Sequence, residues 1–285
     1  MPVIIVAKSL LGLNMCVINY WRIAMNEWQK LPQVSSFFDD KVSEIEQHLA
    51  LLDILLGRHV HIECKKYNTP VEQRYSIERE QGHPFKAGAV LMIYNFMESI
   101  STALMQDIHA HIKNNIGHLT LNDLHAELKD CIVNHANKNE LLKGYIQNYQ
   151  HTKHNLDKLM IMGWVEQWAK EHSATDNNET YPKWFNGNVD TRKIHQSLQN
   201  YGLACDSFNN LKQGKAESLL KIKSARNRLA HGSTTFTEFG QDKSLDDIKQ
   251  DFDNIKGFFQ GLLNIINQHL ISQRYLQSYL RSSTQ

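Results

Sequence analysis

The stretch PFKAGAVLMIYNFMESISTALMQDIHAHIKNNI, residues 84–116, decides the fold class. Its centre, residues 87–97, is apolar on nearly every side, which predicts a long helix buried in the middle of the protein. No proline follows Pro84 until Pro182, and none follows Pro182, so nothing there removes a backbone donor inside a helix. We therefore predict an all-α protein, a helical bundle.

Apolar residues recur at helical spacing on both sides of this stretch. Capping residues and glycines mark the ends of the further helices, which we expect at 35–57, from Thr120 through Leu141 to Trp168, at 191–201 after Asp190, at 216–231, and from Ser244 to beyond 266. Polar residues and turn formers fill 58–82 and 172–188, which we expect to be loops. A turn should separate the last two helices.

The composition excludes disordered and fibrous proteins, because 41% of the 285 residues are hydrophobic. The net charge is +1, which excludes a histone-like or basic-tail protein. The charge is unevenly spread, however: residues 210–232 carry six basic side chains against Glu217 alone. Four scattered cysteines without metal-type spacing indicate a reduced, cytoplasmic protein.

We expect one helical domain over residues 35–275, with a C-terminal tail at 276–285. We expect residues 1–34 to be an N-terminal extension. It is either a helix docked on the domain or the result of a start codon assigned too far upstream. Its apolar run between Lys8 and Arg22 is too short to span a bilayer and has no positive n-region before it, so we expect neither a signal peptide nor a membrane segment.

One segment contains the candidate catalytic residues: LKIKSARNRLAHG, residues 220–232. Gly232 can close a helix in the left-handed conformation, which leaves His231 in the last turn, where helix carbonyls favour a protonated imidazole. The guanidinium of Arg226 can donate hydrogen bonds to two oxygens of a phosphate. Together they suit phosphoryl transfer without a metal ion, with Arg226 stabilising charge and His231 moving a proton.

The spacing sets a geometric condition. Arg226 and His231 lie about 140° apart around an α-helix. They converge only if the helix end unwinds or a second chain completes the site. The same residue types are also common at helix ends where they only satisfy carbonyls, so the spacing leaves both interpretations open.

Four segments in order resemble one family. RNRLAHG (226–232), FDDKVSEIEQHLALLD (38–53), KAGAVLMIYNFMESI (86–100) and WFNGNVDTRKI (184–194) resemble the MAE-like clade of the HEPN superfamily, all-α domains of bacterial defence and toxin-type loci. The Arg-polar-x₃-His spacing is the superfamily's signature. The resemblance covers about residues 38–275.

The resemblance implies a HEPN-type helical bundle that acts as a metal-independent endoribonuclease in a two-fold homodimer, without a cofactor. Arg226 and His231 would be the catalytic pair, and Asn227 would orient the arginine or a phosphate. Glu98 would pair with Arg226, or else be a partly buried acid satisfied by another basic side chain. Ser233 stands where some HEPN toxins have a modified tyrosine, so control by that chemistry is not expected.

The implied reaction is attack of an RNA 2′-OH on the adjacent phosphate, which gives a 2′,3′-cyclic phosphate and a 5′-OH. Lys221, Lys223 and Arg228 are candidates to bind the RNA backbone, although a solvated helix face explains each of them as well. Expected partners are RNA, a second copy of the chain, and an antitoxin or defence protein, with no membrane.

Two other functions stay open: a non-catalytic subunit that binds RNA or nucleotide or scaffolds a partner, and a structural dimer that inhibits a neighbouring toxin. His59, His61 and Cys64 form the best metal-like cluster, but no fourth ligand is identifiable. Solvated loop histidines explain that cluster better, and we expect no metal site.

Overall fold

The computed structural model describes residues 28–57, 60–64, 73–138, 153–171, 173–176, 179–182, 184–185, 187–203 and 206–278. In this part of the chain the protein is all-α, with short strands only in two hairpins. The α-helices are α2 (Pro32–Leu55), α3 (His83–Ile116), α4 (Ala126–Lys138), α6 (Lys153–Glu171), α7 (Thr191–Gln199), α8 (Asp206–Lys212), α9 (Ala216–Ala230), α10 (Phe236–Asp242) and α11 (Leu245–Ile271).

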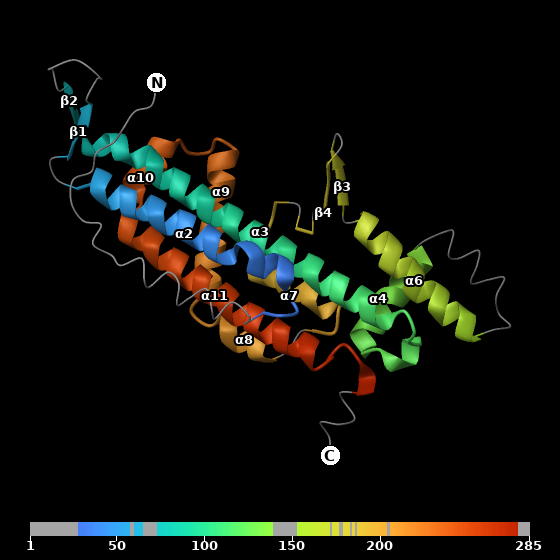
Figure 1. Cartoon of the computed structure of the whole chain (residues 1–285). Helices are drawn as coiled ribbons and strands as arrows, with labels where there is room; N and C mark the ends of the chain where they lie inside the picture. The colour runs from blue at the N-terminus through green and yellow to red at the C-terminus, as the bar shows by residue number, and fades with distance from the viewer. Residues whose placement is uncertain are drawn as a thin grey trace.

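Helix α3 lies at the centre of the bundle, which confirms the prediction of a buried central helix. Figure 1 shows α2 and α11 running alongside it. Phe96 of α3 meets Phe38 of α2 and both Phe252 and Phe259 of α11 edge to face, with ring centroids 5.5 to 6.0 Å apart. All four rings are buried, so the three helices share one aromatic core.

A side chain of α3 fixes where α2 begins. Helix α2 starts at Pro32 and has no capping side chain of its own. Instead, the carboxylate of Asp107 accepts hydrogen bonds from the backbone N–H groups of Gln33 at 3.1 Å and Val34 at 3.0 Å. These donors would otherwise lack partners at the helix start, so the buried carboxylate ties α2 to α3.

Helix α10 packs against the start of α3 and is an additional helix, beyond those expected from the sequence. Gly240 of α10 comes so close that a Cβ there would overlap the backbone carbonyl of His83. The Lys86 amine donates to the carbonyls of Gly240 and Lys243, each at 2.8 Å, which satisfies the end of α10. The prediction of a simple turn between the last two helices is therefore wrong.

The helix expected from Thr120 onward is also corrected. The capping box of Thr120 and Asp123 forms, but it begins only a short 3₁₀ turn, η2 (Leu121–Asp123). The next residue, Leu124, is extended and bridges to Leu276, so α4 begins only at Ala126. A contact between distant parts of the chain thus overrides the local helical signal. Residues 139–152 lie outside the described residues.

Both segments expected to be loops contain antiparallel hairpins. Strands β1 (Val60–Cys64) and β2 (Gln73–Ile77) pair with Val60 opposite Ile77, and a 3₁₀ turn, η1 (Arg79–Gly82), follows. Strands β3 (Ser173–Asp176) and β4 (Glu179–Pro182) pair with Thr175 opposite Thr180. The β-branched residues and the two asparagines between β3 and β4 are ordinary hairpin signals, which a purely helical interpretation overlooks.

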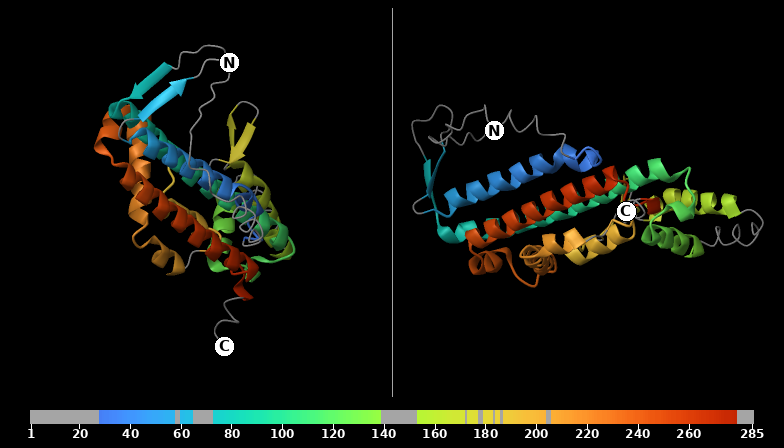
Figure 2. Two further views of the ribbon diagram at one scale, coloured as in Figure 1. Left: turned by 60° about the vertical axis from the view of Figure 1, so that its left-hand side comes forward. Right: turned by 90° about the horizontal axis from the view of Figure 1, so that it is seen from below.

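The hairpin β1–β2 and the pair α4–α6 lie at opposite ends of α3, as both views of Figure 2 show. One apolar core cluster extends from Leu31 to Tyr275, close to the expected bounds of the helical domain. Most of the expected N-terminal extension, residues 1–27, and residues 279–285 of the tail lie outside the described residues.

One helical stretch of the described part, Glu80–Ile116, is long and apolar enough to cross a membrane. It is weak evidence for a membrane span, because 61% of its most apolar window is buried and the core helix of a soluble protein has the same length and composition.

Candidate active site

The motif helix ends as its sequence predicts. Helix α9 stops at Ala230, His231 is the C-cap residue, and Gly232 adopts a left-handed φ of 68°. The N–H of Ser233 donates to the carbonyl of Arg228 at 3.0 Å, and the N–H of Gly232 donates to the carbonyl of Leu229 at 3.3 Å. These two bonds form a Schellman motif, which satisfies the last carbonyls without using the imidazole. The His231 side chain is exposed.

Arg226 lies five residues earlier and is partly buried. Its Nη1 donates to Oδ1 of Asn227 at 3.2 Å. Its guanidinium carbon lies 4.8 Å from the centre of the Tyr94 ring, in cation–π geometry. Gly187 also lies close to the guanidinium, since a Cβ at this position would be 3.3 Å from Nη2. Asn227 and Arg226, two of the residues predicted for the site, are thus in direct contact.

Tyr94 connects α3 to the loop that precedes α7. The tyrosine is fully buried, and its hydroxyl oxygen accepts a hydrogen bond from the N–H of Val189 at 3.3 Å. Burial raises the pKa of Tyr94, opposed by the bond from Val189, while the charge of Glu98 raises it and that of Arg226 lowers it. Tyr94 therefore stays a neutral phenol whose ring faces a cation.

Asp190 connects the same loop to α9. Its carboxylate caps α7 by accepting from the N–H of Lys193 at 2.8 Å, which confirms the predicted cap. The other oxygen pairs with the Lys223 amine at 2.7 Å. Burial alone would raise the pKa of Asp190, but the bonds from Lys223 and Lys193 and the charge of Lys223 lower it overall. Lys223 is thus bound within the protein rather than free for RNA.

The structure does not bring Arg226 and His231 together within one chain. Both are described residues, and no hydrogen bond joins their side chains. Arg226 faces Tyr94 and Gly187, whereas His231 faces solvent at the helix end. Helix α9 is intact as far as Ala230, with His231 as its C-cap, so the helix end does not unwind to bring the two side chains together.

Glu98 lies one turn after Tyr94 on α3 and is half-buried. Its charge acts on Tyr94, as does that of Arg226, so the three groups are neighbours. Among the described residues, however, no ion pair links Glu98 to Arg226. The structure thus places Glu98 beside the arginine's aromatic neighbour rather than on the guanidinium itself.

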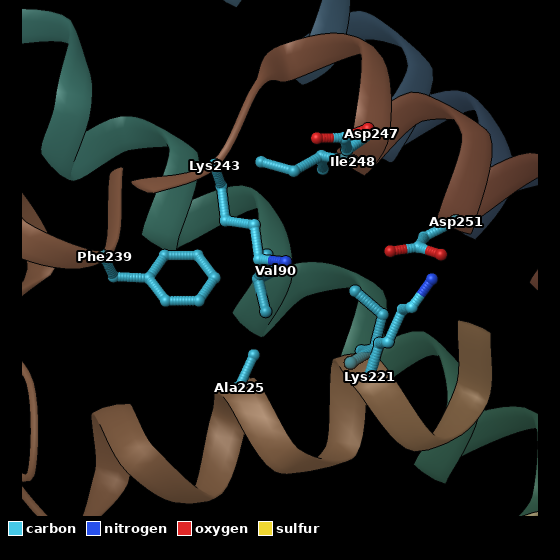
Figure 3. A pocket seen from close by; sticks show the side chains of 9 residues that line it. Val90, Lys221, Ala225, Phe239, Lys243, Asp247, Ile248 and Asp251 are labelled. Atoms are coloured by element: carbon cyan, nitrogen blue, oxygen red, sulfur yellow. The ribbon is translucent and has the colours of Figure 1, made fainter. Parts of the chain in front are cut away.

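The remaining two basic candidates have different surroundings. Lys221 pairs with Glu217 at 3.0 Å, and in Figure 3 its amine points toward Asp251 across a small pocket. The hydrogen bond that Lys221 donates to Glu217, and the charges of Asp251, Glu217 and Asp247, raise the pKa of Lys221. Arg228 is exposed, and no ion pair holds it among the described residues.

The pocket in Figure 3 lies between α3, α9, α10 and α11 and mixes both signs of charge. It is lined by Val90, Lys221, Ile222, Ala225, Phe239, Lys243, Asp247, Ile248 and Asp251. The acidic side chains come from α11, the helix that follows the basic motif segment. They neutralise the side of α9 that carries Lys221.

The metal-like cluster is only partly described. His61 and Cys64 lie on β1, and His59 lies outside the described residues. In the described part of the chain, no group of three or more histidine, cysteine or acidic side chains could hold a metal ion.

Three residues of this site were not singled out for it from the sequence: Tyr94, Gly187 and Val189. A signal was present, because Tyr94 stands in KAGAVLMIYNFMESI and the other two stand in WFNGNVDTRKI, two of the four segments singled out from the sequence. What the sequence lacked was the pairing of these segments, which only packing supplies.

Comparison of the chain with protein-family models, with curated proteins and with solved structures finds no match in any of the three.

Proposed function

We propose that the protein is a metal-independent endoribonuclease of the HEPN type, an effector of a toxin–antitoxin or defence system, with an active site shared between two copies of the chain. One observation carries the proposal: Arg226 is braced by Asn227, and an exposed His231 follows at a helix end that Gly232 closes. The observed all-α bundle is consistent with the resemblance of the four segments.

The separation of Arg226 and His231 supports a site completed by a second chain. The partly buried guanidinium contacts Tyr94 of its own protomer, whereas the imidazole is exposed and backbone hydrogen bonds close the helix end without it. Two such helix ends facing each other across a two-fold axis would place each imidazole near the opposite guanidinium. The helix would not have to unwind.

The reaction would proceed in one displacement at phosphorus. A neutral His231 accepts the 2′-OH proton as the 2′-oxygen bonds to phosphorus, and the bond to the 5′-oxygen breaks. A protonated His231 of the partner subunit gives its proton to the departing 5′-oxygen. Arg226 donates hydrogen bonds to the non-bridging oxygens as their charge grows. The products are a 2′,3′-cyclic phosphate and a 5′-OH.

Purified full-length chain tests this proposal on single-stranded RNA in the presence of EDTA. Cleavage should leave 2′,3′-cyclic phosphate ends and should be lost on DNA and on 2′-O-methyl RNA, which lack the nucleophile. Arg226→Ala and His231→Ala should each lower kcat by about 100-fold or more. His118→Ala, which removes another exposed histidine, is the matched control and should keep full activity.

If two copies of the chain share the active site, activity should depend on protein concentration. Specific activity should rise with the fraction of dimer measured by light scattering, and excess His231→Ala chain should inhibit the wild type by forming mixed dimers. Cleavage abolished by EDTA, or unchanged in both catalytic variants, would overturn the mechanism. RNA binding without cleavage would instead favour the non-catalytic subunit.

A further inference from the structure

Tyr94 is the side chain of α3 that meets the guanidinium of Arg226. Its ring centre lies 4.8 Å from the guanidinium carbon, and the residue is fully buried in the middle of the central helix. A buried aromatic ring has few alternative positions, because its neighbours fill the space around it. Tyr94 therefore offers Arg226 a fixed surface rather than a mobile contact.

The other end of Tyr94 is also fixed. Its hydroxyl accepts the N–H of Val189 at 3.3 Å, and the adjacent Asp190 both caps α7 and pairs with Lys223 of α9. Lys223 lies three residues before Arg226, so both side chains project from the same side of α9 toward this loop. The loop thus joins Tyr94 and α9 at two points.

Gly187 is another close neighbour of the guanidinium. A Cβ at this position would lie 3.3 Å from Nη2 of Arg226, and the left-handed φ of 68° favours glycine in any case. The guanidinium thus has the ring of Tyr94 and a glycine of the loop as close neighbours, and a side chain at that glycine would crowd it.

We propose that Tyr94 is a positioning residue, whose ring holds the Arg226 guanidinium in its reactive orientation before RNA or a second chain binds. The inference rests on the proposed ribonuclease function. Arg226 would then be preorganised within each protomer, and only His231 would have to be brought in by dimerisation. Preorganised charge costs no reorganisation during the reaction, which is why its loss should appear in kcat.

The test distinguishes the contribution of the Tyr94 ring from that of its hydroxyl. Tyr94→Phe keeps the ring beneath the guanidinium and should keep kcat within about threefold. Tyr94→Leu removes the ring and should lower kcat by about 10- to 100-fold, with KM changed less than about threefold, because a misplaced catalytic group of this kind costs up to about 100-fold in rate. Tyr275→Leu, the same change at another fully buried tyrosine, is the control for lost packing and should keep kcat.

A second readout does not depend on activity. In full-length chain labelled with ¹⁵N-arginine, the Arg226 Nε–H signal, assigned by its absence in Arg226→Lys, should be shifted by the ring current of Tyr94. The shift should persist in Tyr94→Phe and Tyr275→Leu and disappear in Tyr94→Leu.

The two readouts distinguish the possible failures. If the wild type cleaves no RNA but the signal behaves as stated, the proposed function fails and Tyr94 still positions Arg226. If the Arg226 signal is unchanged in Tyr94→Leu, or if Tyr94→Phe loses as much activity as Tyr94→Leu, the positioning role of the ring is overturned.

Discussion

Lys223 and Arg228 lie on the same helix and carry the same charge, but their surroundings differ. The side chain of Lys223 is only 15% exposed and pairs with Asp190, whose side chain is 12% exposed. Arg228 is exposed, and its carbonyl rather than its guanidinium takes part in the helix end. The sequence alone cannot separate them, because both are basic residues of one amphipathic helix.

This contrast predicts that the same substitution lowers stability at Lys223 and weakens RNA binding at Arg228. Lys223→Met leaves Asp190 as an unpaired, mostly buried carboxylate and should lower the free energy of unfolding by about 2 kcal/mol. Arg228→Met should leave stability unchanged and should weaken RNA binding, with the slope of log K against log salt reduced by about 1.

Thermal unfolding and RNA titrations at several salt concentrations measure both effects. Equal Tm values for the two variants would contradict the structural role of Lys223. An unchanged salt slope in Arg228→Met would remove Arg228 from the RNA-binding residues.

At the scale of elements, the contact between α10 and α3 depends on one missing side chain. A Cβ on Gly240 would overlap the backbone of His83, which cannot move aside as a flexible side chain can. Lys86 and its two carbonyl partners tie the same helices together. The capping box of Thr235 and Glu238 begins α10, and it was visible in the sequence as Thr-Phe-Thr-Glu.

Gly240→Ala should therefore separate α10 from α3 and lower the free energy of unfolding by about 3 kcal/mol or more, since overpacking against backbone cannot be relieved locally. Gly88→Ala is the matched control, because Gly88 lies within α3 with open space around it. That change should raise stability by about 0.5–1 kcal/mol, because alanine is the better helix former. Urea unfolding measures both, and similar losses in the two variants would refute the close contact.

At the scale of the whole molecule, the near-neutral charge conceals separate basic and acidic regions. The basic motif segment and the acid-rich start of α11 lie against each other in the bundle, and Lys221 faces Asp247 and Asp251 there. The local excess of positive charge that the sequence shows is thus partly neutralised. Arg226 and Arg228 are the cations of the motif that no ion pair holds within the described residues.

The molecule also contains a buried histidine that makes its stability depend on pH. Burial, and then the charge of Arg274, lower the pKa of His269 to about 4 from an ordinary 6.5, although a contact with the Leu203 backbone raises it. The folded state therefore keeps His269 neutral where the unfolded state binds a proton. Stability should be complete above pH 6.5 and should fall as the pH drops from 6.5 toward 4.

The expected loss is about 2–3 kcal/mol across this range, because each unit of pKa shift corresponds to about 1.4 kcal/mol. His269→Gln stays neutral and should flatten the difference between urea unfolding at pH 7.5 and pH 4.5 by that amount. His118→Gln, at an exposed site, should leave the difference unchanged. If His269→Gln keeps the full difference, His269 is not its source.

The sequence by itself predicted much of the fold, and each successful prediction rests on local physics. The apolar centre of 84–116 required burial, Asp190 and Ser244 cap their helices, and Gly232 closes α9. These features depend on residues a few positions apart, which is the range over which backbone hydrogen bonds and helical periodicity act. The positions of Arg226 and His231 on α9 follow from the same rules.

Only the tertiary structure decided what surrounds those positions. Tyr94, Gly187 and Arg226 come from three distant segments, and no periodicity relates them. Packing likewise stopped the helix after Thr120 and gave Lys223 a partner from another element. Contacts between distant residues depend on how whole helices pack. The sequence therefore determined which side chains lie on α9 and at its end, and the fold determined that Arg226 is partly buried against Tyr94 and that His231 is exposed.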